Sequence, residues 1–213
     1  RDSYFLPEGK NMLVDEFGKD YGKYFSILSL IAQGRNTRSE LENILNIKEL
    51  SGYLKNLNEE YGLISKMQPI YEKSTNKNVH YAIEDQFLKF WFRFVYKYMH
   101  IIEAGSNEKL KIIAERDFAT VSGKSLESYF NEVLKESGAY TRLGYWHDRK
   151  GENEIDIIAE DELDNKIEFI EVKRQAKNFD ENVLKAKSEL FFKAVGTFKG
   201  YEVIYRGLSI DDM

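Results

Sequence analysis

Apolar side chains recur at helical spacing through the first sixty residues of the chain. The segment 21–33 carries apolar residues three and four positions apart, which predicts an amphipathic helix. Thr37 and Glu40 lie within the sequence T-R-S-E, the pattern of a capping box, and predict a second helix after Thr37. A third helix is expected over 48–61, because apolar residues again return at helical spacing and a glycine follows.

Two alternating segments, 63–68 and 79–84, follow these helices and predict a two-stranded ribbon joined by the polar loop PIYEKSTNKN. Three short helices and a ribbon form the order of a winged-helix domain, which we place at 21–84. In such domains the last helix can enter the major groove of DNA. The cations that it and the loop would offer are Lys48, Lys55, Lys73 and Lys77. The alternative is a protein-contact module or spacer, since acidic residues share the same helix.

The segment DQFLKFWFRFVYKYM, residues 85–99, predicts an aromatic-rich helix. Aromatic rings can stack on nucleic-acid bases, but so dense a run favours packing between domains. We expect 85–119 to be a helical connector.

The second half of the chain reads as a helix, three strands, a helix and a last strand. The helices are predicted from apolar residues at helical spacing, and the strands from short apolar or alternating runs. The predicted elements are a helix at 122–137, strands at 140–146, 154–159 and 166–173, a helix at 181–193 and a strand at 200–205. The predicted fold class is therefore α/β (α+β overall), with a second domain over 120–213.

Charged residues interrupt two of these strands at positions that point to metal chemistry. Asp156 stands within the apolar run of one strand, and Glu171 and Lys173 end the next on one face. Two carboxylates on adjacent strands can bind Mg²⁺ or Mn²⁺ through oxygen. A neighbouring lysine can stabilise charge on an attacked phosphate or position the attacking water.

An acidic residue two positions before a lysine is a common pattern, and it occurs four times in this chain. Only Glu171 and Lys173 lie at the end of an apolar strand that an acidic strand precedes. The alternative interpretation is an exposed ion pair across strands. No GxSxG or GxGxxG motif is present, and the three histidines lack the spacing of metal ligands.

GENEIDII followed by FIEVKRQ resembles the D-x(n)-E-x-K signature of the PD-(D/E)XK nuclease superfamily, although Ile155 replaces its proline. The resemblance implies an α-β-β-β-α-β core and metal held by Asp156, Glu171 and the carbonyl of Val172. It also implies a catalytic role for Lys173 and a supporting one for Glu127, an acidic residue on the preceding helix.

Residues from about 20 to 206 are similar to the C-terminal part of the archaeal-type P-loop ATPases also found in bacteria. The resemblance rests on YAIEDQFLKFWFRFVY, GKSLESYF and EIDIIAE with FIEVK. It implies an upstream ATPase domain, for which ATP would be the cofactor, with residues 1–20 as its tail. The chain begins at Arg1 and contains no GxxxxGK[ST], so we expect it to be part of a longer protein.

Composition adds limits to these expectations. The chain has no cysteine, which excludes disulfides, thiolate zinc sites and cysteine nucleophiles. No signal peptide or membrane-spanning run is evident, and we expect a cytoplasmic protein. A net charge of −5 weighs against tight non-specific DNA binding.

The leading hypothesis is Mg²⁺-dependent or Mn²⁺-dependent cleavage of DNA by the second domain. One alternative is a nuclease fold kept as a binding or regulatory module of the ATPase. Another is a regulator that binds DNA through the winged helix alone.

Overall fold

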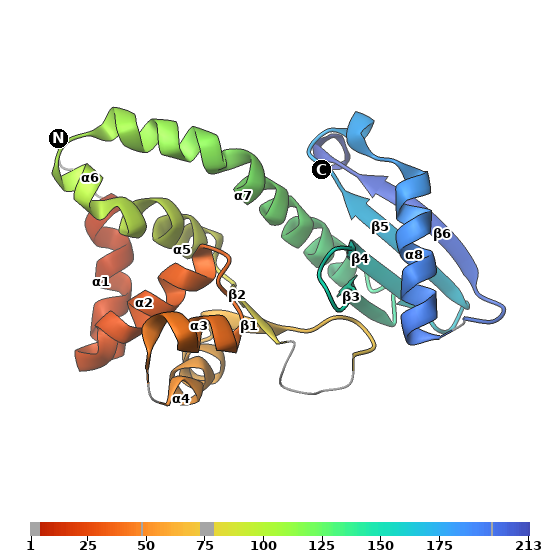
Figure 1. Cartoon of the computed structure of the whole chain (residues 1–213), viewed down its shortest axis with the longest axis horizontal. Coiled ribbons are helices and arrows are strands. Elements are labelled where there is room, and N and C mark those ends of the chain that lie inside the picture. The colour runs from red at the N-terminus through yellow and green to blue at the C-terminus, as the bar shows by residue number, and fades with distance from the viewer. Residues whose placement is uncertain (1–4, 48, 73–78, 197) are drawn as a thin grey trace. The chain divides into compact units, whose positions relative to one another are not determined.

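The computed structural model describes residues 5–47, 49–72, 79–196 and 198–213 (Figure 1). Lys48, Lys73 and Lys77, three of the four expected nucleic-acid contacts, lie outside the described residues. The chain has a mixed α/β fold and divides into two compact units. The first unit comprises Arg1–Met67 with Asn76–Arg116, and the second comprises Gln68–Thr75 with Asp117–Met213.

The first unit consists of short helices and a two-stranded antiparallel ribbon. Its elements are α1 (Phe5–Phe17), a 3₁₀ turn (Gly18–Asp20), α2 (Tyr21–Ala32), α3 (Arg38–Leu45), α4 (Leu50–Lys55), a π-helical turn (Asn56–Glu60), β1 (Ile64–Met67), β2 (His80–Ile83), α5 (Gln86–Phe90), π-helical and 3₁₀ turns (Trp91–Val95 and Tyr96–Tyr98) and α6 (Met99–Glu103). Every described helix of the chain is too short or too polar to span a bilayer.

The predicted capping box is present at the start of α3. The Thr37 hydroxyl accepts the Glu40 N–H at 3.3 Å, and the Thr37 N–H donates to the Glu40 carboxylate at 3.1 Å. This reciprocal pair satisfies two backbone donors that the first turn leaves without partners. The start of this helix could be predicted because the interaction lies within four consecutive residues.

The aromatic run at 85–99 packs into the core of the first unit. Trp91 and Phe92 are fully buried, and the ring of Phe25 from α2 meets both edge to face. Packing was the expected role, but the partner is α2 of the same unit rather than another domain. The helix predicted at 122–137 also begins earlier, at Asn107, and runs unbroken to Glu136 as α7.

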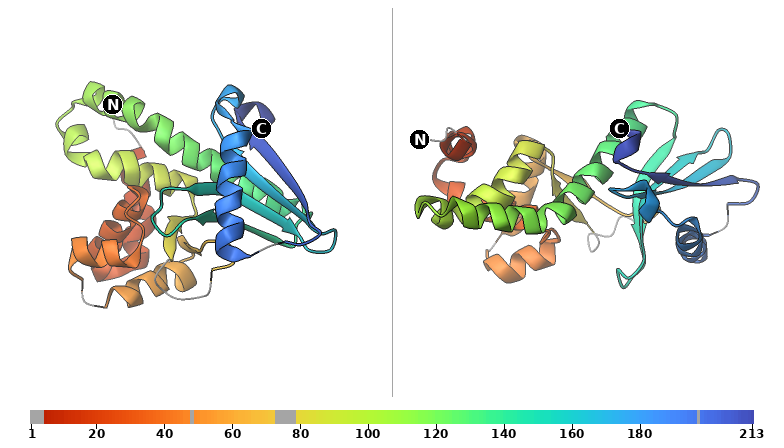
Figure 2. Two further views of the ribbon diagram at one scale, coloured as in Figure 1. Left: turned by 45° about the vertical axis from the view of Figure 1, so that its right-hand side comes forward. Right: turned by 90° about the horizontal axis from the view of Figure 1, so that it is seen from above.

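The second unit is a four-stranded mixed sheet between two helices (Figure 2). Its remaining elements are β3 (Arg142–His147), β4 (Glu154–Asp161), β5 (Lys166–Val172), a 3₁₀ turn (Ala176–Asn178), α8 (Glu181–Val195), β6 (Glu202–Leu208) and a last 3₁₀ turn (Ile210–Asp212). The strand order is β3-β4-β5-β6, in which β4 is antiparallel to both β3 and β5, and β6 runs parallel to β5. Residues of α7 pack on one face of the sheet and residues of α8 on the other.

The start of the loop expected to be a polar wing belongs to the second unit. The Ile70 N–H donates to the Tyr145 carbonyl of β3 at 2.7 Å, and the Ile70 side chain is buried. The Tyr71 hydroxyl donates to the buried carboxylate of Glu160. This segment therefore covers part of an edge strand whose backbone groups would otherwise need water.

Gly207 of β6 lies against the ring of Phe179, and a substitution at Gly207 tests this contact. A Cβ atom at Gly207 would lie 2.5 Å from the ring of Phe179. We expect Gly207→Ala to lower the unfolding free energy of the second unit by about 1–3 kcal/mol, the usual cost of overpacking. Urea unfolding followed by Trp146 fluorescence in a Trp91→Phe background would measure it.

Gly123→Ala is the matched control, because nothing lies within 4 Å of a Cβ atom added in α7. It should leave stability equal or raise it by up to about 1 kcal/mol, as alanine favours helix. Adding Phe179→Ala should relieve the strain of Gly207→Ala. Equal stability of the two glycine variants would contradict this packing.

Candidate functional site

A β-bulge in β4 places Asp156. Trp146 of β3 pairs with Ile155, but Gly144, two residues earlier, pairs with Ile158, three residues later. Two residues of β4, Asp156 and Ile157, therefore oppose the single residue Tyr145. Such a bulge breaks the regular alternation of side chains and redirects one of them.

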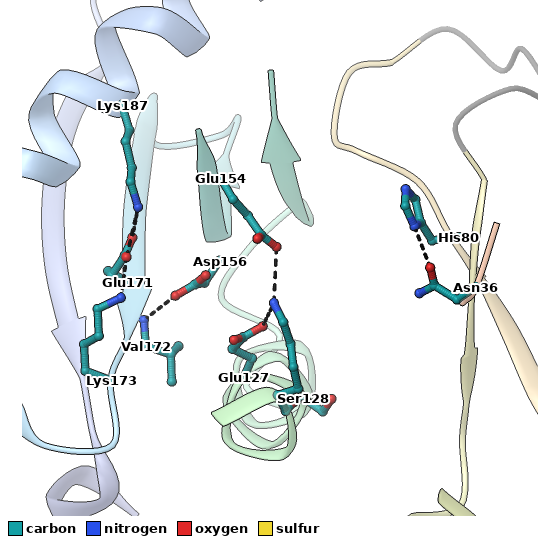
Figure 3. Close-up of polar contacts among 11 residues, drawn as sticks. Asn36, His80, Glu127, Ser128, Glu154, Asp156, Glu171, Val172, Lys173 and Lys187 are labelled. Carbon is teal, nitrogen blue, oxygen red and sulfur yellow. Dashed lines mark hydrogen bonds and ion pairs between the residues drawn. The ribbon is translucent and has the colours of Figure 1, made fainter. Parts of the chain in front are cut away.

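Asp156 lies against the end of β5, where its Oδ2 accepts the Val172 N–H at 2.8 Å (Figure 3). Burial, together with the negative charges of Glu127 and Glu171, raises the pKa of Asp156 to about 7. The hydrogen bond from Val172 and the charge of Lys124 act in the opposite direction but are outweighed. A cation bound beside Asp156 would stabilise its ionised form and so lower this raised pKa.

Glu171 is buried at the end of β5 and is held by two lysines. Lys187 of α8 lies 3.0 Å from both carboxylate oxygens, and Lys173 lies 2.6 Å from Oε1. Burial, the largest single influence, would lower the pKa of Lys173. The hydrogen bond to Glu171, together with the negative charges of Glu171 and the neighbouring carboxylates, outweighs burial and raises this pKa overall. Both lysines are thus charged partners of one buried carboxylate, as Figure 3 shows.

Glu127 approaches from α7 on the other side of Asp156 (Figure 3). Its Oε2 accepts a hydrogen bond from Lys124 at 2.8 Å, and Lys124 also lies 3.3 Å from Oε1 of Glu154. Burial raises the pKa of Glu127, while Lys124 lowers it by a smaller amount. Burial would lower the pKa of Lys124, but the two carboxylates, with Glu127 foremost, raise it overall.

The structure brings together five expected residues: Asp156, Glu171, Val172, Lys173 and Glu127. Lys55, expected to contact nucleic acid, lies on α4 of the first unit. It is exposed and lies 3.8 Å from Glu59, at the length limit of an ion pair.

Three further site residues, Lys124, Glu154 and Lys187, did not emerge from the sequence. A signal existed for Lys187, because Leu184, Ser188 and Phe191 of α8 are buried at positions −3, +1 and +4 from it. A lysine within this stripe must face the sheet, where it needs an acidic partner. Lys124 and Glu154 lie thirty residues apart, and no local pattern joins them.

The described residues contain no ready-made group of three or more acidic or histidine side chains that could hold a metal ion. Asp156 and Glu171, with the backbone of Val172, supply the oxygen ligands that Mg²⁺ and Mn²⁺ prefer. Four carboxylates and three ammonium groups face each other here. The donor set fits a hard divalent ion, provided that Glu171 exchanges a lysine contact for it.

Comparisons with known proteins identify relatives without a described activity. A family described as archaeal and bacterial proteins of unknown function matches residues 91–185. An uncharacterized protein of Methanocaldococcus jannaschii is 33% identical over 203 residues, which cover 91% of this chain and 44% of that protein. The chain thus spans less than half the length of this relative. No solved structure gives a significant match.

The raised pKa of Asp156 predicts a pH dependence of stability in the absence of divalent ions. The pKa is about 7 in the folded chain, against an ordinary value of 3.8. Between about pH 4 and pH 7 the folded protein keeps a proton that the unfolded chain has lost. The unfolding free energy should therefore fall as pH rises through this window, by at most about 1.4 kcal/mol per pH unit.

Asp156→Asn should remove this slope, because its amide does not titrate. Asp164→Asn, at an exposed position of the same unit, should keep it. Urea unfolding at pH 5, 6, 7 and 8, with a chelator present, would measure the slopes. Parallel pH profiles of wild type and Asp156→Asn would contradict the assignment.

Proposed function

We propose that the second unit is a metal-dependent phosphodiesterase of the PD-(D/E)XK nuclease type that cleaves DNA. The observation that carries this proposal is the convergence of Asp156 and Glu171, from neighbouring strands, beside Lys173. The Glu171 charge contributes to the raised pKa of Asp156, so the two carboxyl groups interact electrostatically. Carboxyl groups whose pKa values are raised by burial and by neighbouring charges are common at catalytic sites.

The topology supports the same proposal. A helix, three antiparallel strands, a crossover helix and a parallel fourth strand follow each other in the second unit. This is the α-β-β-β-α-β order that the resemblance to the PD-(D/E)XK superfamily implies. Asp156 near the start of β4 and Glu171 near the end of β5 then fall at one end of the sheet, because the two strands are antiparallel.

Asp156, Glu171 and the carbonyl of Val172 would hold the metal, with Glu127 as a supporting carboxylate. When bound, a divalent ion lowers the pKa of its water and offsets charge on a phosphate. A divalent ion would also turn the slight negative excess of the site into a positive one. The site could then attract a phosphate even though the whole chain carries a net charge of −5.

Lys173 is the chain's own candidate for contact with the scissile phosphate. Its side chain is 35% exposed, whereas that of Glu171 is 10% exposed, so Lys173 is the more solvent-accessible partner of this ion pair. Its ammonium group can stabilise negative charge that develops on a phosphoryl oxygen or orient a water molecule. Glu171 keeps this ammonium charged through the 2.6 Å contact.

The first unit contains short helices followed by a two-stranded ribbon, and we propose that it is a winged helix that acts as a DNA-contact or packing module. The resemblance to the archaeal-type P-loop ATPases supports the further proposal that these units belong with an ATPase domain whose ligand is ATP. The M. jannaschii relative, more than twice as long as the matched region, leaves room for such a domain. In this proposal the two units are the part of the ATPase that contacts and cleaves DNA.

A second candidate function is a non-catalytic binding or regulatory module of the ATPase. The observation that favours it is the neutralisation of Glu171 by two lysines, which can stabilise the fold without any metal. In this case the wild-type protein would bind DNA or its ATPase domain but would not cleave a phosphodiester.

A plasmid assay distinguishes the two functions. With Mn²⁺, the wild-type chain should nick supercoiled DNA, and Asp156→Ala should abolish nicking by removing a metal ligand. Asp164→Ala is the matched control, since Asp164 and Lys166 repeat the acid-x-lysine pattern at an exposed turn. Nicking that survives Asp156→Ala would overturn the proposed site. Absence of nicking by wild type with any divalent ion, alone or joined to an ATPase domain, would favour the binding module.

The variant Lys173→Met distinguishes a catalytic role of Lys173 from a purely structural one. The ion pair is partly exposed, so its loss should cost at most about 1 kcal/mol of stability. If Lys173 acts in the transition state, the variant should stay folded and bind Mn²⁺ but lose cleavage by about 10²-fold. Titration calorimetry and the nicking assay on one preparation would measure both, with Lys166→Met as control. Full cleavage by Lys173→Met would remove it from the mechanism.

A further inference from the structure

Lys187 of α8 binds Glu171 in the manner of a metal ion. Its Nζ lies 3.0 Å from Oε1 and 3.0 Å from Oε2, so it stands midway between the two oxygens (Figure 3). This is the position on a carboxylate that a bidentate cation occupies. Lys173, in contrast, contacts Oε1 alone.

The pair is shielded from water. The Lys187 side chain is 19% exposed and that of Glu171 10%. Six lysines that form ion pairs elsewhere, in contrast, have side chains at least 43% exposed: Lys23, Lys55, Lys111, Lys124, Lys166 and Lys185. Gly207 is the β6 partner of Glu171, and the Phe179 ring packs directly over it. A lysine is rarely buried without a specific partner, because the desolvation of its charge is costly.

Glu171 has more cationic partners than its charge requires. Lys173 alone would neutralise it, yet α8 provides a second ammonium group from within its buried stripe. A single carboxylate with two lysines carries a local excess of one positive charge. Departure of one lysine would therefore leave an ordinary ion pair rather than an unpaired buried charge.

We infer that Lys187 holds the metal-binding oxygens of Glu171 until a divalent ion takes its place, so that metal binding at this site is an exchange of cations. Lys187 is a positioning residue, which acts through Glu171 and sets the affinity for the ion. The inference rests on the proposed function, because it takes Glu171 as a metal ligand. The flexible four-carbon stem of lysine allows its head group to move aside while α8 stays in place.

The exchange makes metal affinity the property to measure. Calorimetric titration of Mn²⁺ into the full chain would compare wild type with Lys187→Met, which keeps the apolar stem and removes the competing charge. We expect Lys187→Met to bind Mn²⁺ about tenfold more tightly, the equivalent of a partly buried ion pair of about 1.4 kcal/mol. Lys187→Arg keeps the charge and can form a two-pronged bond with Glu171, so its affinity should equal that of wild type or fall.

Two further variants separate direct competition from a general effect of charge. Lys185→Met removes a lysine of α8 that pairs with Glu181 on the surface, and it should leave the affinity unchanged. Lys173→Met removes the other partner of Glu171, which binds one oxygen and is more exposed. If competition for both oxygens is the cause, Lys187→Met should raise the affinity more than Lys173→Met does.

The outcomes distinguish this inference from the proposed function. Equal or weaker Mn²⁺ binding by folded Lys187→Met, with wild-type binding that Asp156→Asn abolishes, would overturn the exchange and leave the metal site standing. Binding by Lys187→Met but not by wild type would support the exchange. If neither protein binds Mn²⁺, both the exchange and the metal site fail. Near-ultraviolet circular dichroism would verify folding, and Lys187→Gln would replace Lys187→Met if that variant unfolds.

Discussion

The neutralisation of Glu171 is the constraint on which the candidate site depends. β5 is covered by helices on both faces, so a carboxylate near its end loses most of its water and needs cationic partners. Lys173 comes from the same strand, but Lys187 reaches Glu171 only because α8 packs across the sheet. Phe179 against Gly207 closes the same region from the β6 side. The metal chemistry proposed for Glu171 therefore depends on the packing of an entire helix.

Asp156 is the complementary case of a carboxyl group without a cation of its own. Its one backbone hydrogen bond does not offset burial and the charges of Glu127 and Glu171, so its pKa is raised to about 7. The lysines of the site are directed elsewhere, toward Glu171 on one side and Glu127 and Glu154 on the other. With this unequal distribution of cations, Asp156 is the group that would gain most from the divalent ion of the proposed site.

The sequence alone determined those features whose cause lies within a few residues. Thr37 and Glu40 specify a capping box because they are three positions apart. The apolar runs around Asp156 and before Glu171 specified two of the sheet strands, and with them these two carboxylates of the proposed site. Helix limits were less predictable. The sequence predicted a connector that ends at residue 119 and a separate helix from 122, whereas α7 is continuous across this boundary. No proline interrupts the described helix between 107 and 136.

Only the tertiary structure decided how these residues are paired. The bulge at Asp156 arises from the pairing of β4 with β3, and the sequence of β4 alone does not encode it. Lys187 finds Glu171, and Lys124 finds Glu154, across long separations in the chain. Ile70 and Tyr71 were expected in a polar loop, yet both belong to the second unit. There Ile70 hydrogen-bonds to the edge strand β3 and Tyr71 to the buried carboxylate of Glu160. The sequence determines which charges are available, whereas packing decides which of them meet.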